Sequence, residues 1–144
     1  MHKIDQIVLL HSSTRQIHKI SPYLPTPTYK TTAEHLKNKT KVLLTTGFYI
    51  NNTAETDGPI GTILLADTLK KLNIEPVLIS DHYCINFLQN ASAHRVIEFP
   101  ILNHEESQKF AQELIKQESP DCLISIERCG FAKDYKYFEI LYLI

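Results

Sequence analysis

The sequence predicts an α/β fold: a doubly wound, Rossmann-like, mainly parallel sheet of four strands behind an N-terminal helical lead-in. Four short apolar runs, each of strand length, are separated by stretches whose apolar residues recur at helical spacing. Strands that alternate with helices form successive βαβ units, so the sheet is expected to be parallel. Right-handed crossovers then favour the strand order 3-2-1-4. The expected strands are 42–46, 76–80, 95–99 and 122–126.

The three segments between these strands are predicted to be helices. The first is expected to start at Pro59, because proline fits the opening turn of a helix. The third places Phe110 and Leu114 on one face. The run 122–126 is apolar without alternation, which predicts a strand covered on both faces. The expected helices are 59–72, 81–90 and 104–118.

The chain is expected to have a helical lead-in, an α/β domain and a short apolar tail. The lead-in would contain an amphipathic helix over 4–20 and then a proline-rich connector. Thr32 is expected to cap a short helix over 33–38. The three parts are 1–40, 41–138 and 139–144.

Composition limits the class of protein. The chain has 144 residues, of which 43% are hydrophobic and 22% charged, and its formal net charge is −1. This near-neutral charge gives no electrostatic reason to expect binding to nucleic acid or to an anionic membrane. The apolar runs are too short to span a bilayer or to form a signal-peptide core. We therefore expect a cytoplasmic protein.

The cysteines and histidines predict neither disulfides nor zinc. Three cysteines without close pairing do not make a disulfide framework. Cys122 is expected to be a small buried residue of a strand. Cys129 lies in a loop beside Arg128, but no histidine is placed by the sequence to activate its thiol. The histidines show no metal-ligand spacing.

The loop after the first strand is the most informative segment. It carries three of the four glycines, Gly47, Gly58 and Gly61, and two acids, Glu55 and Asp57. In α/β proteins, ligands bind in such loops outside the carboxyl ends of the strands. The helix that starts after Gly58 would direct free amide groups into the crevice and favour an anion.

The two acids of this loop differ in how they can be explained. Asp57 could be only the helix cap, a position that aspartate favours. Capping does not require Glu55, which therefore points to chemistry. The loop is not a phosphate loop, because no Gly-Lys-Ser/Thr follows it. Gly47 and Gly58 are also too far apart for the dinucleotide fingerprint.

The loop after the fourth strand carries Glu127, Arg128 and Gly130. Alone, Glu127 and Arg128 would be read as a solvated pair at a strand end. In the order 3-2-1-4, however, this loop and the loop after the first strand face each other where the winding reverses. Three carboxylates and one guanidinium would then line one crevice.

Two motifs carry a resemblance to a known family. The first reads Thr-Gly-Phe at 46–48 and Glu-Thr-Asp-Gly-Pro-Ile-Gly at 55–61, with Leu-Ala at 65–66. The second reads Ser-Ile-Glu-Arg at 125–128, followed by Gly130. Together they resemble the C-terminal domain of the D-glutamate cyclase family, long catalogued as a bacterial domain of unknown function. The likeness covers 41–138, and the lead-in resembles the family's helical lead-in only loosely.

The chain departs from the family pattern near its end. The family usually has Pro-Gly-Arg after Glu-Arg, where this chain has Cys129-Gly130-Phe131. Residues 134–138 echo the start of the family's next segment, but 139–144 match nothing in it. The comparison therefore predicts a truncated chain, and the apolar tail would favour homo-oligomers.

The resemblance implies a hydro-lyase that converts D-glutamate into 5-oxo-D-proline and water by intramolecular lactam closure. Charge and expected geometry assign proton transfer to Glu55 or Asp57, with Glu127 as the alternative. Arg128 would hold the substrate's α-carboxylate, and amides after Gly58 would stabilise the oxyanion. The expected substrate-binding residues are Thr46, Gly47, Gly58 and Arg128.

Other classes of function stay open. The same crevice could bind a small anion or a nucleotide without turnover. Lactam chemistry requires no cofactor, although the carboxylates could hold a divalent metal ion together with substrate oxygens. The chain could also be an inactive fragment. Assays with D- and L-glutamate would separate these alternatives.

Overall fold

The computed structural model describes residues 7, 10, 19, 21–23, 28–50, 53–128 and 130. The chain divides into two compact units, Met1–Asn38 and Lys39–Ile144. The predicted helix over 4–20 lies outside the described residues except for isolated positions. The apolar tail 139–144 and Cys129 also lie outside them.

The first unit contains η2 (Ser21–Tyr23) and α2 (Thr28–Lys37). α2 begins before Thr32, which therefore lies inside the helix, so the prediction of a cap at this residue was wrong. No helix breaker stands between Pro27 and Thr32, and the helix can therefore extend back to the end of the proline-rich segment.

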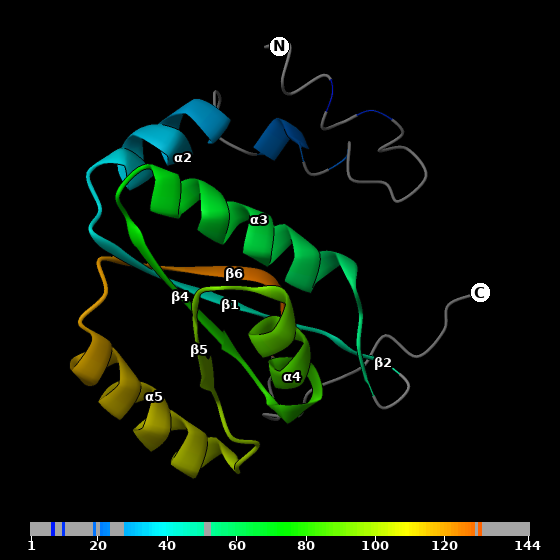
Figure 1. Ribbon diagram of the computed structural model, residues 1–144. Coiled ribbons are helices and arrows are strands. Elements are labelled where there is room, and N and C mark those ends of the chain that lie inside the picture. The colour runs from blue at the N-terminus through cyan, green and yellow to red at the C-terminus, as the bar shows by residue number, and fades with distance from the viewer. Residues whose placement is uncertain are drawn as a thin grey trace. The chain divides into compact units, whose positions relative to one another are not determined.

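A parallel sheet of four strands lies at the centre of the second unit (Figure 1). Its strands are β1 (Lys41–Gly47), β4 (Glu75–Ser80), β5 (Arg95–Glu98) and β6 (Cys122–Arg128). They pair in the order β5-β4-β1-β6, and each pair is parallel. Numbered along the chain, this is the order 3-2-1-4, so the predicted topology is confirmed.

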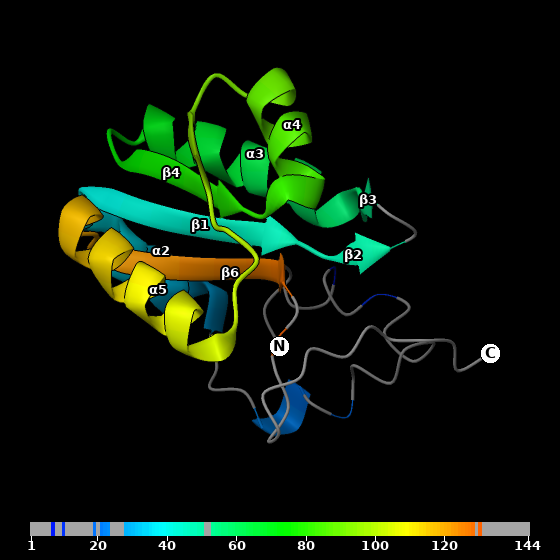
Figure 2. The same ribbon diagram turned by 90° about the horizontal axis from the view of Figure 1, so that it is seen from below.

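The helices of the second unit cover both faces of the sheet. α3 (Asp57–Lys71) joins β1 to β4, and α4 (His82–Ala91) joins β4 to β5. α5 (His104–Glu118) crosses back to β6. Figure 2 shows α3 and α4 on one face and α5 on the other. The chain reverses its direction of winding after β5, and right-handed crossovers require that the helices change face there.

A small hairpin separates β1 from α3. β2 (Tyr49–Ile50) and β3 (Thr53–Ala54) pair in an antiparallel ladder. The amide of Glu55 then donates to the carbonyl oxygen of Phe48 at 2.8 Å. This bond returns the chain to the end of β1, so that Glu55 lies next to the start of α3.

The core consists of two apolar layers, one on each face of the sheet. Leu43, Val77 and Ile79 pack with Leu114 of α5. Leu44, the next residue of β1, is fully buried, and it points to the opposite face because side chains alternate along a strand. Burial of each large apolar side chain contributes roughly 1.5–3 kcal/mol to the stability of the fold.

Within the described part of the chain, no helix is both long enough and apolar enough to cross a bilayer.

β6 departs from the prediction of a strand covered on both faces. Its residues alternate between half-buried and exposed, and 51% of Leu123 remains accessible. Cys122 is likewise half-exposed, not buried. The reason is position, because β6 is an edge strand that pairs with β1. Apolar composition does not distinguish an edge strand from a central one.

Glu118 at the end of α5 forms a charged network with the starts of two strands. Its side chain is only 2% accessible. Both terminal nitrogens of Arg95 donate to its carboxylate, at 2.7 and 2.6 Å. The Nζ of Lys41 lies 3.5 Å from the same carboxylate. The hydrogen bonds from Arg95 are the main reason why the pKa of Glu118 lies below its ordinary value of 4.5.

Replacing Glu118 with glutamine is expected to lower the free energy of unfolding at pH 7 by roughly 1.5–3 kcal/mol, the range for hydrogen bonds to charged groups. Because the folded-state pKa is depressed, this contribution is complete above about pH 4.5 and is lost as the pH falls through the folded-state pKa. Urea unfolding at several pH values would measure it.

Glu105→Gln is the control, because the carboxylate of Glu105 pairs with Lys109 at 2.9 Å but is 79% exposed. Its effect is expected to stay within about 0.5 kcal/mol. A Glu118→Gln deficit that stayed constant as the pH was lowered would contradict the proposed linkage.

Candidate functional site

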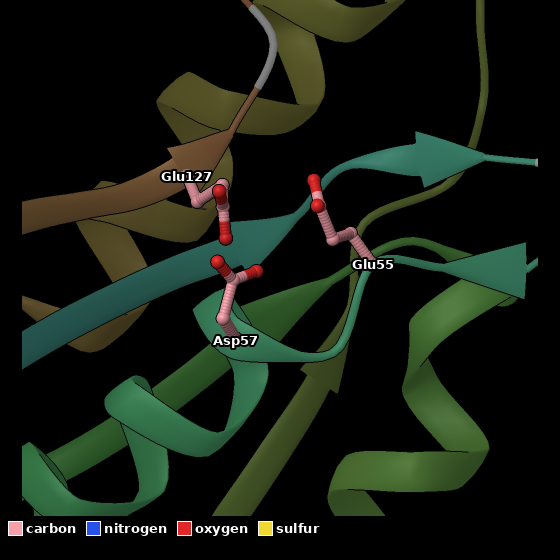
Figure 3. Close-up of side chains that lie close together, drawn as sticks. All are labelled: Glu55, Asp57 and Glu127. Atoms are coloured by element: carbon pink, nitrogen blue, oxygen red, sulfur yellow. The ribbon is translucent and has the colours of Figure 1, made fainter. Parts of the chain in front are cut away.

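Three acids from the two predicted loops meet at the start of α3. Figure 3 shows Glu55 and Asp57 opposite Glu127, which comes from the end of β6. One carboxylate oxygen of each residue lies within 4.8 Å of those of the other two, and the side chains are open to solvent. We call these three residues the carboxylate cluster. Among the described residues, it is the group that could hold a metal ion.

Asp57 is the first residue of α3, and the cap position is Thr56. The interpretation of Asp57 as the helix cap was therefore wrong. The hydrogen bond from the amide of Glu55 to Phe48 closes the hairpin directly before Thr56. The helix therefore begins two residues earlier than the predicted start at Pro59. The Oδ1 of Asp57 accepts a hydrogen bond from the amide of Gly58 at 3.1 Å. An acid in the first turn is also favoured by the helix dipole.

Glu127 holds its proton more tightly than an ordinary glutamate. Its pKa lies above 4.5, chiefly because it forms a hydrogen bond with the carboxylate of Asp57. Partial desolvation and the negative charges of Asp57 and Glu55 raise this pKa further, while a hydrogen bond from the amide of Gly58 opposes the rise. Asp57 and Glu127 therefore form a pair of interacting carboxyl groups in which the pKa of Glu127 is raised.

A bulge at the end of β6 gives Glu127 its orientation. Thr46 pairs with Ile126, and Gly47 pairs with Arg128, so Glu127 is the extra residue of the ladder. Its φ of 47° lies in the left-handed region, which is uncommon for a residue other than glycine. Such backbone conformations cost free energy and persist only where surrounding contacts fix them. They cluster at functional sites.

Gly58 has no side chain, and Glu127 occupies the space that a Cβ at this position would fill. A Cβ at this position would lie 2.7 Å from the Oε2 of Glu127 and 3.1 Å from the Oγ1 of Thr46. The amide of Gly58 donates to the protein's own carboxylates, and Pro59 has no amide hydrogen. The start of α3 therefore binds acids of this chain, where free amides for an external anion were expected.

Thr46 lies beneath the carboxylate cluster. Its side chain is completely buried, and its Oγ1 has no hydrogen-bond partner among the described residues. Most buried hydroxyl groups are hydrogen-bonded, so an exception needs a reason.

Arg128 is held by Asp81, which lies at the start of α4, whereas the carboxylate cluster lies at the start of α3. Its Nη1 donates to the Oδ2 of Asp81 and, at 3.1 Å, to the carbonyl oxygen of Gly47. In the described part of the chain, all hydrogen bonds of Arg128 come from this one nitrogen. Nη2 and Nε remain available for a carboxylate.

Asp81 is the residue of this region that sequence reasoning missed. It caps α4 by accepting a hydrogen bond from the amide of Tyr83 at 3.0 Å, and it also binds Arg128. The available signal was an aspartate at the first position of a predicted helix, directly after a predicted strand. Capping alone explains such an aspartate, so the contact with Arg128 could not be inferred.

Gly47 ends β1 in a conformation that favours glycine. Its φ is 115°, and a Cβ would lie 2.6 Å from the Oγ of Ser80 and 3.1 Å from the Nη1 of Arg128. The residue therefore allows both the turn after the strand and the close approach of the guanidinium.

A cavity of about 240 Å³ lies beside Arg128. Arg128, Asp81 and Gly47 form its polar side, and Tyr83 and Phe99 contribute to the apolar side. The volume is below the range of about 300–1,000 Å³ that drug-sized ligands occupy. The cavity therefore suits a small molecule.

Fold and site together define an α/β domain with a solvent-exposed cluster of acids at the carboxyl end of its parallel sheet, where the winding reverses. Residues 4–140 match the family described as D-glutamate cyclase-like, C-terminal. The chain belongs to this family, which confirms the resemblance seen in its two motifs. No curated protein and no solved structure matches the chain.

Proposed function

We propose that the chain closes D-glutamate to 5-oxo-D-proline with release of water. The family description supports this chemistry at the level of the family. The observation that carries the proposal is the meeting of Glu55, Asp57 and Glu127 in one solvent-accessible cluster. These acids come from the two motifs on which the family resemblance rests.

The reaction is balanced without a co-reactant. The α-nitrogen forms a bond to the carbon of the γ-carboxylate, and one carbon–oxygen bond of the same carboxylate breaks. The ammonium nitrogen loses two protons, and the departing oxygen gains two and leaves as water. Catalysis therefore requires groups that move protons from nitrogen to oxygen.

The pair of Asp57 and Glu127 supports this proton transfer. The two carboxyl groups are in contact and the pKa of Glu127 is raised, so a group that holds its proton more tightly lies beside a second carboxylate that can accept one. Glu55 lies beside them as a further base. Arg128, two of whose nitrogens form no hydrogen bond with the described residues, would bind a substrate carboxylate.

The test is an assay of the purified chain with D-glutamate, in which 5-oxoproline is quantified by proton NMR. We expect 5-oxo-D-proline to form above the spontaneous rate. L-glutamate under the same conditions tests the stereochemical preference. If D-glutamate binds but no lactam forms, the proposed activity is wrong.

A small-ligand binding module is the second candidate. The observation that favours it is the cavity beside Arg128, whose lining contains none of the three acids. Such a module would bind D-glutamate or another small carboxylate without consuming it. Its binding would depend on Arg128 and not on Glu127.

A further inference from the structure

The unpartnered hydroxyl of Thr46 and the carboxylate cluster border the same space. A Cβ on Gly58 would lie 3.1 Å from the Oγ1 of Thr46 and 2.7 Å from the Oε2 of Glu127. Because glycine has no Cβ, both oxygens face this position. The hydroxyl has no partner among the described residues, although Thr46 is fully buried. A ligand atom that donates to Glu127 beside Gly58 could also complete the hydrogen bonding of Thr46.

The chemistry of the site selects a positively charged hydrogen-bond donor. The carboxylates of Glu55 and Asp57 are acceptors, and the hydroxyl of Thr46 can accept as well. An anion would be repelled, and the amide of Gly58 already donates to the cluster. A primary ammonium group carries one positive charge and three donors in a tetrahedral arrangement.

The cluster is compact enough for one donor group to contact more than one of its acids. One carboxylate oxygen of each residue lies within 4.8 Å of those of the other two, and a nitrogen donates to an oxygen at about 2.9 Å. One nitrogen can therefore reach several of them at once.

We propose that the carboxylate cluster and the hydroxyl of Thr46 bind a primary ammonium group. The inference rests on the proposed function, in which this group is the α-ammonium of D-glutamate. The nitrogen that must lose two protons would then lie next to the pair of Asp57 and Glu127. Thr46 would orient the nitrogen, and the cluster would remove its proton.

The experiment compares D-glutamate with glutarate, which has both carboxylates but no amine, by isothermal titration calorimetry on the full chain. We expect D-glutamate to bind at least tenfold more tightly. Thr46→Val removes the hydroxyl at nearly constant shape. It is expected to weaken D-glutamate binding by about tenfold to a hundredfold, the effect of one hydrogen bond to a charged group, and to leave glutarate binding unchanged.

Thr68→Val is the matched control. Thr68 lies on α3, and its hydroxyl donates to the carbonyl oxygen of Leu64 at 2.8 Å, away from the cluster. Its replacement is expected to change neither affinity. Thermal melting of both variants shows whether they fold, and the selectivity of the wild-type chain tests the inference independently of either variant.

Equal affinity for glutarate and D-glutamate would overturn the inference. So would a folded Thr46→Val variant that binds D-glutamate like the wild type, or Mn²⁺ binding at the cluster that excludes D-glutamate. Selective amine binding without lactam formation would support the ammonium site and contradict only the proposed activity. Lactam formation without a preference for D-glutamate over glutarate would support the proposed activity and contradict the ammonium site.

Discussion

Replacing Glu127 with glutamine is expected to reduce the rate of lactam formation from D-glutamate by about 10²–10⁴-fold, the usual contribution of a positioned acid or base. Glutamine has nearly the same shape and can still donate a hydrogen bond to Asp57. It cannot accept or release a proton at the relevant pH. The measurement is kcat/KM for 5-oxo-D-proline formation, accompanied by a melting curve.

Stability should change little in this variant, because the substitution also removes one negative charge from a crowded cluster. Glu105→Gln is the control, since it makes the same chemical change on the exposed surface of α5. Asp57→Asn combined with Glu127→Gln should cost about as much as either alone, because residues that act as one unit are not additive. Full turnover in Glu55→Gln, Asp57→Asn and Glu127→Gln would show that the proposal is wrong.

Replacing Gly58 with alanine is expected to abolish most of the activity by displacing the carboxylate of Glu127. The added Cβ would lie 2.7 Å from Oε2 and 2.8 Å from the Cβ of Glu127, which is too close for either atom to stay in place. Such overpacking costs roughly 1–3 kcal/mol. The higher helix propensity of alanine offsets at most about 1 kcal/mol.

Gly61→Ala is the matched control, because it lies in the same helix and its added Cβ would meet nothing within 4 Å. It should retain activity and be slightly more stable, by up to about 1 kcal/mol. Adding Glu127→Gly to Gly58→Ala should recover stability without recovering activity, because glycine removes both clashing atoms, Oε2 and Cβ, together with the proton carrier. Wild-type turnover in Gly58→Ala would mean that the position of Glu127 is unimportant.

Most secondary structure in the second unit followed from local pattern. The helix over 104–118 was predicted with the bounds of α5, and the four strands were found within two residues of their expected ends. Helical and strand periodicities differ enough to be read from short segments. The strand order followed because right-handed crossovers leave few alternatives.

Predictions that depended on an element's neighbours were less successful. β6 has the apolar composition of a central strand but lies at the edge, where Leu123 is half exposed. Asp57 has the residue type of a helix cap, yet the preceding hairpin moves the cap to Thr56. In both cases the deciding contact comes from a segment outside the local pattern.

Within the site, the sequence alone determined which residues reach the carboxyl end of the sheet. Glu55, Asp57, Glu127 and Arg128 follow strands whose order is constrained by chain chirality, so their presence at one crevice could be anticipated. Their two motifs also identified the family that the match over 4–140 shows.

Only the tertiary structure decided which of these groups contact one another. The bulge in β6 directs Glu127 to Asp57, while Arg128 turns to Asp81. Glu127 and Arg128 are neighbours in the sequence, yet they contact the starts of two different helices, α3 and α4. The hydroxyl of Thr46 lies buried beside the cluster. Side-chain direction at a strand end depends on a single residue of register and on backbone angles such as the positive φ of Glu127. Residue types and their spacing do not encode these quantities, and long-range packing sets them.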